Sequence, residues 1–280
     1  MTQDPDDYPH GGRIVTTEVM VRASPAAAWQ AWADPATLSQ WFTDRARGQV
    51  AEGASFTWIF DRFGSEFTYT VVKAEAPRRL ILSGAPPGRP PYVLEVVIRA
   101  EAEGCRIRVI NSGFAMSTDN DEEFEGVLSG WTMALSILKE YLEEHFGEEK
   151  QGFFAMQAAQ FGYEEALHFF TREDGLARWL SAGGEIGPVG TSYQLSLHSG
   201  EAITGRVLAI TSREVALSWD EIGGILELKS FLLGPRTRAL CLRGCGWSLS
   251  EEGAARIEMQ MSRALNRLVR ALTGPGNYVH

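Results

Sequence analysis

Apolar and polar residues alternate in Arg13–Ala23, RIVTTEVMVRA, at the start of the first patterned segment of the chain. A period of two with β-branched residues predicts a half-buried strand. Ser24 and Pro25 then predict the start of a short helix, because serine is a good N-cap and proline suits the first turn. Asp34 and Pro35 repeat this signal for a second short helix. Three apolar residues are expected to share one face of that second helix: Leu38, Trp41 and Phe42.

The same pattern predicts several further strands and one long helix. Ser55–Phe60, SFTWIF, is an alternating strand, and Glu66–Pro77 and Arg78–Gly84 are expected to be neighbouring meander strands. Pro91–Phe114 is expected to form a hairpin that turns near Gly104. Asp121–Phe146 is predicted to be a long amphipathic helix. Its N-cap candidates are Ser117, Thr118 and Asp119.

The chain contains an internal repeat. Ala28–Phe42 and Ala166–Leu180 share the same order of apolar residues, and Trp41 aligns with Trp179. The downstream segments follow in the same order, and each half ends in a long amphipathic helix. We therefore predict two copies of one domain. The predicted boundaries are a tail at 1–12, domains at 13–148 and 149–273, and a tail at 274–280.

The order of elements in each copy is strand, two short helices, several strands and a long helix, which indicates an α+β fold. An antiparallel sheet and a long helix must bury their apolar sides against each other. We expect a strongly curved sheet around the long helix, with the short helices filling one end. This arrangement leaves a space between helix and sheet, toward which the aromatic residues of the short helices would point.

The first half of the chain resembles a known family. The residues that carry the resemblance are VRASPAAAWQAWADPATLSQWF (Val21–Phe42), GASFTW (Gly53–Trp58), VVKAEAPRRLILS (Val71–Ser83) and GWTMALSILKEYLE (Gly130–Glu143). They resemble homologues of the activator of the heat-shock protein 90 ATPase, in the START-like (SRPBCC) superfamily with the helix-grip fold. The second half resembles the family only through the repeat, with Arg263 and Ala264 in place of Gly130 and Trp131.

The resemblance implies two tandem helix-grip domains, each a curved antiparallel sheet around a long C-terminal helix with two short helices. It also implies a cavity between helix and sheet, where superfamily members bind hydrophobic small molecules and a few, such as aromatase/cyclases, catalyse reactions. The namesake stimulates a chaperone. Members often carry a histidine where this chain has Val127. Fold alone does not fix function.

Composition and charge exclude several classes of protein. The 280 residues carry a net charge of −10; residues 1–150 hold 23 acids and 14 bases, and residues 151–280 hold 13 acids and 12 bases. Because no cluster of lysine and arginine occurs, we expect neither nucleic acid nor an anionic membrane surface as a partner. The acidic N-terminus lacks the pattern of a signal peptide, which favours a cytoplasmic protein.

No residue pattern indicates a metal or a cofactor. The cysteines Cys105, Cys241 and Cys245 are expected to be buried free thiols, because an odd, small number argues against a disulfide framework. The five histidines have no metal-ligand spacing. The glycine-rich segment Gly183–Gly190 follows a helix and lacks lysine, so it is expected to be a loop. We therefore predict no metal and no cofactor.

The aromatic residues of the first half could form core alone or also line a pocket. Glu95 could lie on a solvated face, or it could point into the cavity with Arg99, Arg106 or Arg108 as its partner. Asn111 could donate to a ligand or merely end its strand. The predicted ligand-binding residues are Trp32, Trp41, Phe42, Phe56, Trp58, Tyr69, Glu95, Asn111, Phe114 and Trp131.

Three hypotheses of function follow. The first is a non-catalytic START-like protein that binds a hydrophobic small molecule in the first domain. The second is a cyclase- or hydrolase-type enzyme that uses Glu95 with an arginine. The third is a co-chaperone-like interaction protein whose acidic run Asp119–Glu125 docks a basic partner; the alternative for this run is an ordinary solvated helix start.

Overall fold

The computed structural model describes residues 12–84, 91–116, 121–234 and 237–274. The described chain forms two compact units, residues 1–131 and residues 132–280, which divide within one long helix. Each unit contains one seven-stranded antiparallel sheet. The tandem α+β architecture expected from the sequence is therefore confirmed. The boundary between residues 148 and 149 remains a prediction, and the expected tails lie almost wholly outside the described residues.

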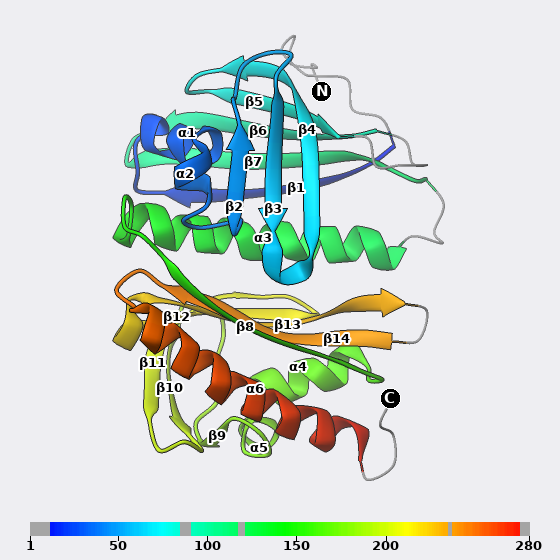
Figure 1. Cartoon of the computed structure of the whole chain (residues 1–280), viewed down its shortest axis with the longest axis vertical. Coiled ribbons are helices and arrows are strands. Elements are labelled where there is room, and N and C mark those ends of the chain that lie inside the picture. Colours follow the sequence, from blue (N-terminus) through cyan, green and yellow to red (C-terminus); the bar gives the residue numbers. More distant parts are fainter. Residues whose placement is uncertain (1–11, 85–90, 117–120, 235–236, 275–280) are drawn as a thin grey trace. The chain divides into compact units, whose positions relative to one another are not determined.

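The first sheet curls, so that β2–β4 run across the direction of β6 and β7 (Figure 1). Two short helices, α1 (Pro25–Ala33) and α2 (Pro35–Leu38), follow its first strand, and α3 (Asp121–Glu144) follows its last. A one-turn 3-10 helix, η1, covers Asp61–Phe63. The strands in spatial order are β1 (Arg13–Val21), β7 (Gly104–Phe114), β6 (Tyr92–Glu101), β5 (Arg79–Gly84), β4 (Ser65–Glu75), β3 (Ser55–Phe60) and β2 (Arg45–Gly48).

The second sheet repeats this order of strands. Its helices are α4 (Tyr163–Thr171), α5 (Glu173–Leu176) and α6 (Glu251–Thr273), with a 3-10 turn, η3, at Asp220–Ile222. The strands in spatial order are β8 (Gln151–Ala159), β14 (Thr237–Gly246), β13 (Gly224–Gly234), β12 (Glu214–Trp219), β11 (Ala202–Ile210), β10 (Ser192–Leu197) and β9 (Ser181–Gly183).

One hydrogen bond demonstrates the repeat at the level of single atoms. The indole N–H of Trp41 donates to the carbonyl oxygen of Ala31 at 2.8 Å, and that of Trp179 donates to the carbonyl oxygen of Phe169 at 2.8 Å. Both tryptophans are buried. In each unit this bond ties the end of the second short helix to the first, so the aligned residues also share a structural role.

The predicted helix starts are confirmed. The Ser24 hydroxyl accepts from the backbone N–H of Ala27 at 3.1 Å, and the Asp34 carboxylate accepts from that of Thr37 at 2.8 Å. The second helix is shorter than expected, because α2 ends at Leu38. The predicted N-cap residues of α3, Ser117, Thr118 and Asp119, lie outside the described residues.

Apolar side chains fill the space between α6 and the second sheet. On α6 the buried residues recur with helical periodicity at Ile257, Met261, Leu265 and Leu268. They belong to one continuous cluster that also includes Trp179, at the end of the short helices. The second unit therefore has a continuous apolar core.

The three cysteines are free and buried, as the sequence predicts. Cys241 and Cys245 lie on the uninterrupted strand β14, and burial raises the pKa of the Cys241 thiol to about 12. Protonated, buried thiols of this kind are weak nucleophiles. Across the described ranges, no helix combines the length and apolar character needed to cross a membrane.

Candidate ligand-binding site

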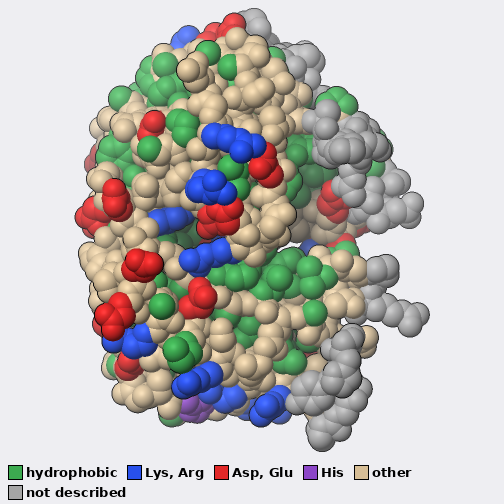
Figure 2. Space-filling view, in the orientation of Figure 1, with side chains coloured by type: hydrophobic (Ala, Val, Ile, Leu, Met, Phe, Trp, Pro, Cys, Tyr) green, Lys and Arg blue, Asp and Glu red, His purple; other side chains and the backbone are tan. Residues whose placement is uncertain are grey.

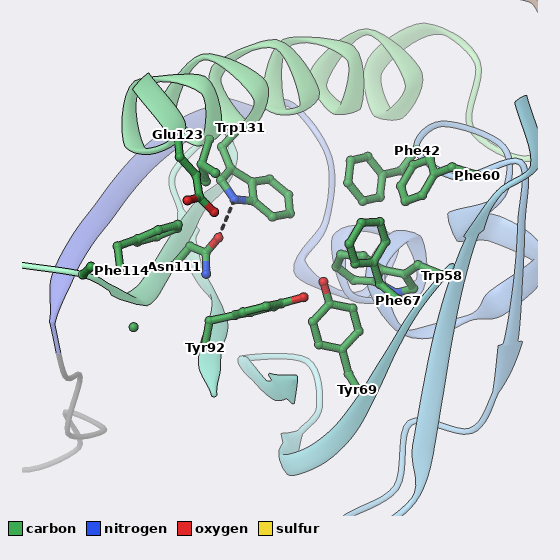
Figure 3. A pocket seen from close by; sticks show the side chains of 13 residues that line it. Phe42, Trp58, Phe60, Phe67, Tyr69, Tyr92, Asn111, Phe114, Glu123 and Trp131 are labelled. Atoms are coloured by element: carbon green, nitrogen blue, oxygen red, sulfur yellow. Dashed lines mark hydrogen bonds between the residues drawn. The ribbon is translucent and has the colours of Figure 1, made fainter. Parts of the chain in front are cut away.

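The first unit contains a cavity of about 620 Å³ between its sheet and the N-terminal part of α3 (Figure 3). This volume lies within the range typical of small-molecule sites. Most of the lining is aromatic. The described lining residues are Phe42, Trp58, Phe60, Phe67, Tyr69, Tyr92, Asn111, Gly113, Phe114, Ala115, Glu123, Val127 and Trp131.

The rings of the wall hold one another in place. Phe42, just after α2, stacks on Trp131 of α3 with ring centroids 5.5 Å apart, and meets Trp58 of β3 edge-on at 5.2 Å. The ring centroids of Trp58 and of Tyr69 on β4 are 4.7 Å apart. Offset and edge-on pairs of this kind stabilise each other beyond their area of burial. The wall is therefore a rigid apolar surface built from several separate elements.

Asn111 fixes the orientation of Trp131. The side-chain amide of Asn111 on β7 donates to the carbonyl oxygen of Val93 at 3.1 Å, and its oxygen accepts from the indole N–H of Trp131 at 3.2 Å. Because both ends of the amide are engaged, its plane and the indole ring are held together. The role of Asn111 in the structure is thus to position a ring of the wall.

Two phenols lie side by side at another part of the cavity. The ring centroids of Tyr69 and Tyr92 are 6.0 Å apart in an edge-on arrangement. Burial raises the pKa of Tyr69 well above its ordinary value, and the neighbouring Tyr92 raises it further. Burial also raises the pKa of Tyr92. Both groups therefore remain neutral donors and acceptors near pH 7.

Two further polar groups of the lining bear on ligand chemistry. Trp58 is 2% exposed, and within the described part of the chain its indole N–H has no hydrogen-bond partner. A buried donor without an acceptor costs free energy. Glu123, on the first turn of α3, is the only residue with a formal charge among the described lining residues, and its side chain points to the same side as Asn111 (Figure 3).

Most of the predicted site residues meet at this cavity. Those that line it are Phe42, Trp58, Tyr69, Asn111, Phe114 and Trp131. Trp32, Trp41 and Phe56 are buried but do not line it. Trp32 contacts both Trp41 and Trp131, with ring centroids 5.1 and 5.9 Å apart. These three residues support the wall from behind.

Sequence analysis missed several lining residues, although signals for them exist. Glu123, Val127 and Trp131 are spaced by four residues, which places them on one face of a helix. Tyr92 precedes Leu94 by two residues on a strand and therefore shares its face. Phe60 and Phe67 were also missed, although Phe60 follows Trp58 by two residues on β3 and Phe67 precedes Tyr69 by two on β4, so each shares a face with a predicted residue. Gly113 and Ala115 have small side chains that carry no pattern of their own.

The solvated-face interpretation of Glu95 is wrong. Glu95 is 3% exposed, and its carboxylate accepts from the guanidinium of Arg79 at 2.7 Å. It does not line the cavity either. The alternate residues of the same strand, Leu94, Val96 and Ile98, are buried as well. Both faces of β6 are therefore covered at this point of the sheet.

The arginines expected beside Glu95 are also differently placed. Arg106 pairs with Glu18 at 2.7 Å and with Glu101 at 3.1 Å, and Arg108 pairs with Glu18 at 3.3 Å. Arg99 is exposed. The arginine paired with Glu95 comes instead from the start of β5, which lies beside β6 in the sheet. Sequence spacing could not show this pairing because it depends on strand order.

We expect Glu95→Gln to lower the free energy of unfolding by about 2–3 kcal/mol, because it removes the charge-assisted bond to buried Arg79. Binding of an apolar fluorescent probe should not change, because Glu95 does not line the cavity. Urea unfolding and a probe titration of the same variant separate the two effects. Weaker probe binding by a variant of unchanged stability would contradict this placement of Glu95.

The acidic run Asp119–Glu125 begins outside the described residues. Its described part starts with Asp121, which forms an ion pair with Arg13, and the guanidinium of Arg13 lies 4.0 Å from the ring centre of Phe124. Glu123 lines the cavity. The structure thus uses part of the run within the unit, and a basic docking partner remains a prediction.

On the side of the first unit seen in Figure 2, charged side chains of both signs lie next to each other. Over β2–β4, Arg45 forms an ion pair with Asp61, and Arg47 forms one with Glu66. This surface is therefore mixed in charge rather than basic. Among the described residues, no group of three or more His, Cys, Asp or Glu side chains could hold a metal ion.

The first half of the chain is similar to one protein family. Residues 22–143 match the family model described as "Activator of Hsp90 ATPase homolog 1-like protein". The resemblance that the sequence suggests is thus confirmed for this segment, and the two sheets confirm the tandem arrangement. No curated protein sequence matches the chain.

Several solved structures are similar to the chain. DynU16, from the dynemicin biosynthetic locus, is 19% identical with a TM-score of 0.42, over 92% of this chain and 98% of DynU16. The di-domain ARO/CYC BexL from the BE-7585A biosynthetic pathway is 10% identical with a TM-score of 0.43, over 94% and 99%. Aha1 from Colwellia psychrerythraea is 19% identical with a TM-score of 0.42, over 47% and 96%.

Proposed function

We propose that the first unit binds a small, largely apolar molecule with an aromatic or otherwise flat body. The observation that carries this proposal is the cavity of about 620 Å³ with eight aromatic side chains in its lining. A flat apolar body can stack against rings that already hold one another in place, so little conformational entropy is lost on binding.

The polar groups of the cavity support a ligand with a hydrogen-bond acceptor. The hydroxyl groups of Tyr69 and Tyr92, two residues of the lining, remain protonated near neutral pH and can donate to a carbonyl or ether oxygen. A few fixed polar groups in an apolar cavity are what orient a bound small molecule.

The catalytic alternative has less support. An enzyme of this kind would need a carboxylate and an arginine inside the cavity. Glu95 forms an ion pair with Arg79, but neither residue lines the cavity. Catalysis by general acid and base requires such groups within hydrogen-bond reach of the substrate. Binding without chemistry is therefore the function we propose.

We expect Val127→Trp to abolish binding of the apolar probe Nile red. Val127 lines the cavity from α3, and a tryptophan there would occupy much of the space. The measurement is a fluorescence titration, with thermal unfolding as a check of the fold. We expect the affinity to fall at least roughly ten-fold, because a filled site excludes the probe sterically.

Leu128→Trp is the matched control. Leu128 is the next residue of the same helix, is 38% exposed and does not line the cavity. This variant should bind Nile red like the original protein. Equal binding by both variants would refute the cavity as the binding site.

Native mass spectrometry of the protein purified from its own host would identify any small molecule that co-purifies with it.

A further inference from the structure

We infer that Tyr69 and Tyr92 together bind one carbonyl oxygen of the ligand, and that Gly84 sets the spacing of the two phenols. The ligand class is then a flat aromatic ketone. This inference rests on the proposed function, and it adds the polar group of the ligand and a positioning residue, Gly84, outside the described lining. It follows from the orientation of two hydroxyl groups and from the packing of their rings against a glycine.

The hydroxyl groups of the two tyrosines point toward each other in the cavity (Figure 3). Tyr69 comes from β4 and Tyr92 from the start of β6, and their ring centroids are 6.0 Å apart. Since the rings are this close, a ligand oxygen that reaches one hydroxyl group lies near the other as well. Burial raises the pKa of both phenols, so each keeps the hydrogen that it can donate near pH 7.

A carbonyl oxygen suits two converging donors better than an ether oxygen does. Its two lone pairs lie in the plane of the carbonyl group and point in different directions, so it can accept from both phenols. Conjugation keeps an aryl carbonyl in the plane of its ring. The flat body can then lie against the neighbouring rings, among them Trp58, whose centroid is 4.7 Å from that of Tyr69.

Gly84 sets the distance between the two phenol rings. It lies on β5, the strand between β4 and β6, and is paired with Tyr92. A Cβ atom on Gly84 would lie 3.2 Å from a ring carbon of Tyr69 and 3.2 Å from one of Tyr92, and contacts this short require a shift of a few tenths of an ångström. Both rings therefore pack against the backbone of Gly84, and a side chain there would displace the hydroxyl groups.

A second glycine confines Tyr92 from the opposite neighbouring strand. Gly113 on β7 has a φ of +101°, a conformation that favours glycine. A Cβ atom there would lie 2.8 Å from the Cα atom of Tyr92. Because β5 and β7 flank β6 in the sheet, Tyr92 begins its strand between two glycines. The backbone around the phenol pair is thus shaped for these two rings.

The experiment compares two ligands of nearly the same shape, 2-acetylnaphthalene and 2-isopropenylnaphthalene, in which a C=CH₂ group replaces the C=O group. Displacement of Nile red from the full chain gives both affinities. We expect the ketone to bind roughly three- to ten-fold more tightly, the net effect of hydrogen bonds that replace those to water. The infrared stretching frequency of the labelled carbonyl group should be lower in the complex than in an aprotic solvent, because hydrogen bonds weaken the C=O bond.

Tyr69→Phe and Tyr92→Phe should each lower the affinity for the ketone roughly three- to ten-fold, as expected for the loss of one hydrogen bond, and leave that for the alkene within about two-fold. The carbonyl frequency should rise toward its value in the aprotic solvent. Tyr193→Phe is the matched control: buried Tyr193 lies in the second unit, where its hydroxyl group donates to the carbonyl oxygen of Ser218 at 2.6 Å. This control should change neither affinity nor the frequency.

Gly84→Ala should lower the ratio of ketone affinity to alkene affinity at least roughly three-fold, because both phenols would be displaced from the shared oxygen. Gly183→Ala is the matched control, since a Cβ atom on Gly183, in strand β9, would have no described atom within 4 Å. It should leave the ratio unchanged. Thermal unfolding shows whether each variant is folded.

The outcomes separate the two proposals. If both ligands bind and Val127→Trp abolishes their binding, but the ketone has no advantage or the Tyr→Phe variants weaken both ligands equally, the carbonyl inference is wrong and the proposed function stands. If Gly84→Ala alone leaves the ratio unchanged, the role of Gly84 is wrong. If neither ligand binds, or if Val127→Trp leaves binding unchanged, the cavity is not a ligand site and both proposals are wrong.

Discussion

Glu227→Gln is expected to lower the free energy of unfolding of the second unit by about 3–5 kcal/mol, the usual cost of breaking a buried ion pair from one side. Glu227 is 2% exposed and pairs with two cations, Arg243 and Lys229. Lys229 also lies 2.8 Å from a carboxylate oxygen of Glu214. The four side chains form a neutral cluster, and the change would leave two buried cations with one anion.

The position of this cluster explains why its charges are so poorly solvated. Glu227 and Lys229 alternate along β13 with Leu226 and Leu228, which face the apolar core. The cluster therefore occupies the other face of the sheet. That face is also covered, because Ala216, which pairs with Glu227 across the strands, packs against Met133 of α3.

The same cluster gives a pH dependence with a defined sign. Burial alone would raise the pKa of Glu227, but Arg243 and Lys229 together hold it below its ordinary value. A carboxylate with a lowered pKa stabilises the fold above its unfolded-state pKa of about 4.3, and this contribution is lost as pH falls through the folded-state pKa. The stability difference between the original protein and Glu227→Gln should therefore shrink below about pH 4.

Urea unfolding at pH 7 and at pH 3.5, with hydrogen exchange of the β12–β14 amides, measures both effects in the second unit. Glu185→Gln is the matched control, because Glu185 is exposed; its effect should stay within about 0.5 kcal/mol. The double variant Glu227→Leu/Arg243→Met should recover most of the loss, since apolar residues can replace a buried pair. An unchanged stability of Glu227→Gln would mean that water reaches the cluster.

The sequence predicted the repeat and the order of elements because both depend on local patterns. Alternation marks the strands, periodicity of 3.6 marks the long helices, and the capping residues Ser24 and Asp34 mark two helix starts. The strands β2 and β9 were not predicted, because four and three residues are too short to show alternation. Local sequence patterns thus predicted only those helices and strands that are long enough to show alternation or helical periodicity.

The surroundings of each sheet face could not be predicted in the same way. Alternation shows which residues share a face, but not what covers that face. Glu95, Glu227 and Lys229 therefore resemble solvent-facing residues in the sequence and are buried in the structure. Their partners come from neighbouring strands, and the pairing depends on register rather than on spacing along the chain.

The repeat also explains why only part of the candidate site could be assigned. Trp131 corresponds to Ala264 in the second half, and Ala264 belongs to the apolar core of that unit. Trp41 corresponds to Trp179, and both have the same hydrogen bond to the first short helix. A tryptophan present in both halves therefore has a role in the fold, whereas a tryptophan present only in the first half can serve a site.

Trp179→Ala is expected to cost about 3–5 kcal/mol of unfolding free energy and to leave Nile red binding unchanged. Trp179 is fully buried, belongs to the core of the second unit and makes a hydrogen bond that alanine cannot make. Trp41→Ala should have a similar cost in the first unit, because Trp41 is also buried and does not line the cavity. Urea unfolding and a probe titration of both variants test this.

Trp131→Ala should show the opposite balance. Trp131 touches the cavity on one side, so its removal deletes fewer packing contacts than the loss of a core tryptophan, and we expect a cost of about 2–3 kcal/mol. The cavity would lose the ring that stacks on Phe42 and the donor that binds Asn111. We expect Nile red affinity to fall at least roughly ten-fold, the equivalent of 1.4 kcal/mol.

Trp131→Phe separates the ring from its hydrogen bond. Phenylalanine keeps an aromatic face toward Phe42 but cannot donate to Asn111, so about 1 kcal/mol of stability should be lost while most probe binding remains. If Trp179→Ala abolishes probe binding and Trp131→Ala does not, the ligand site lies in the second unit. If both variants lose only stability, the rings around Trp131 are core rather than the wall of a site, and the resemblance between the two halves extends to their interiors.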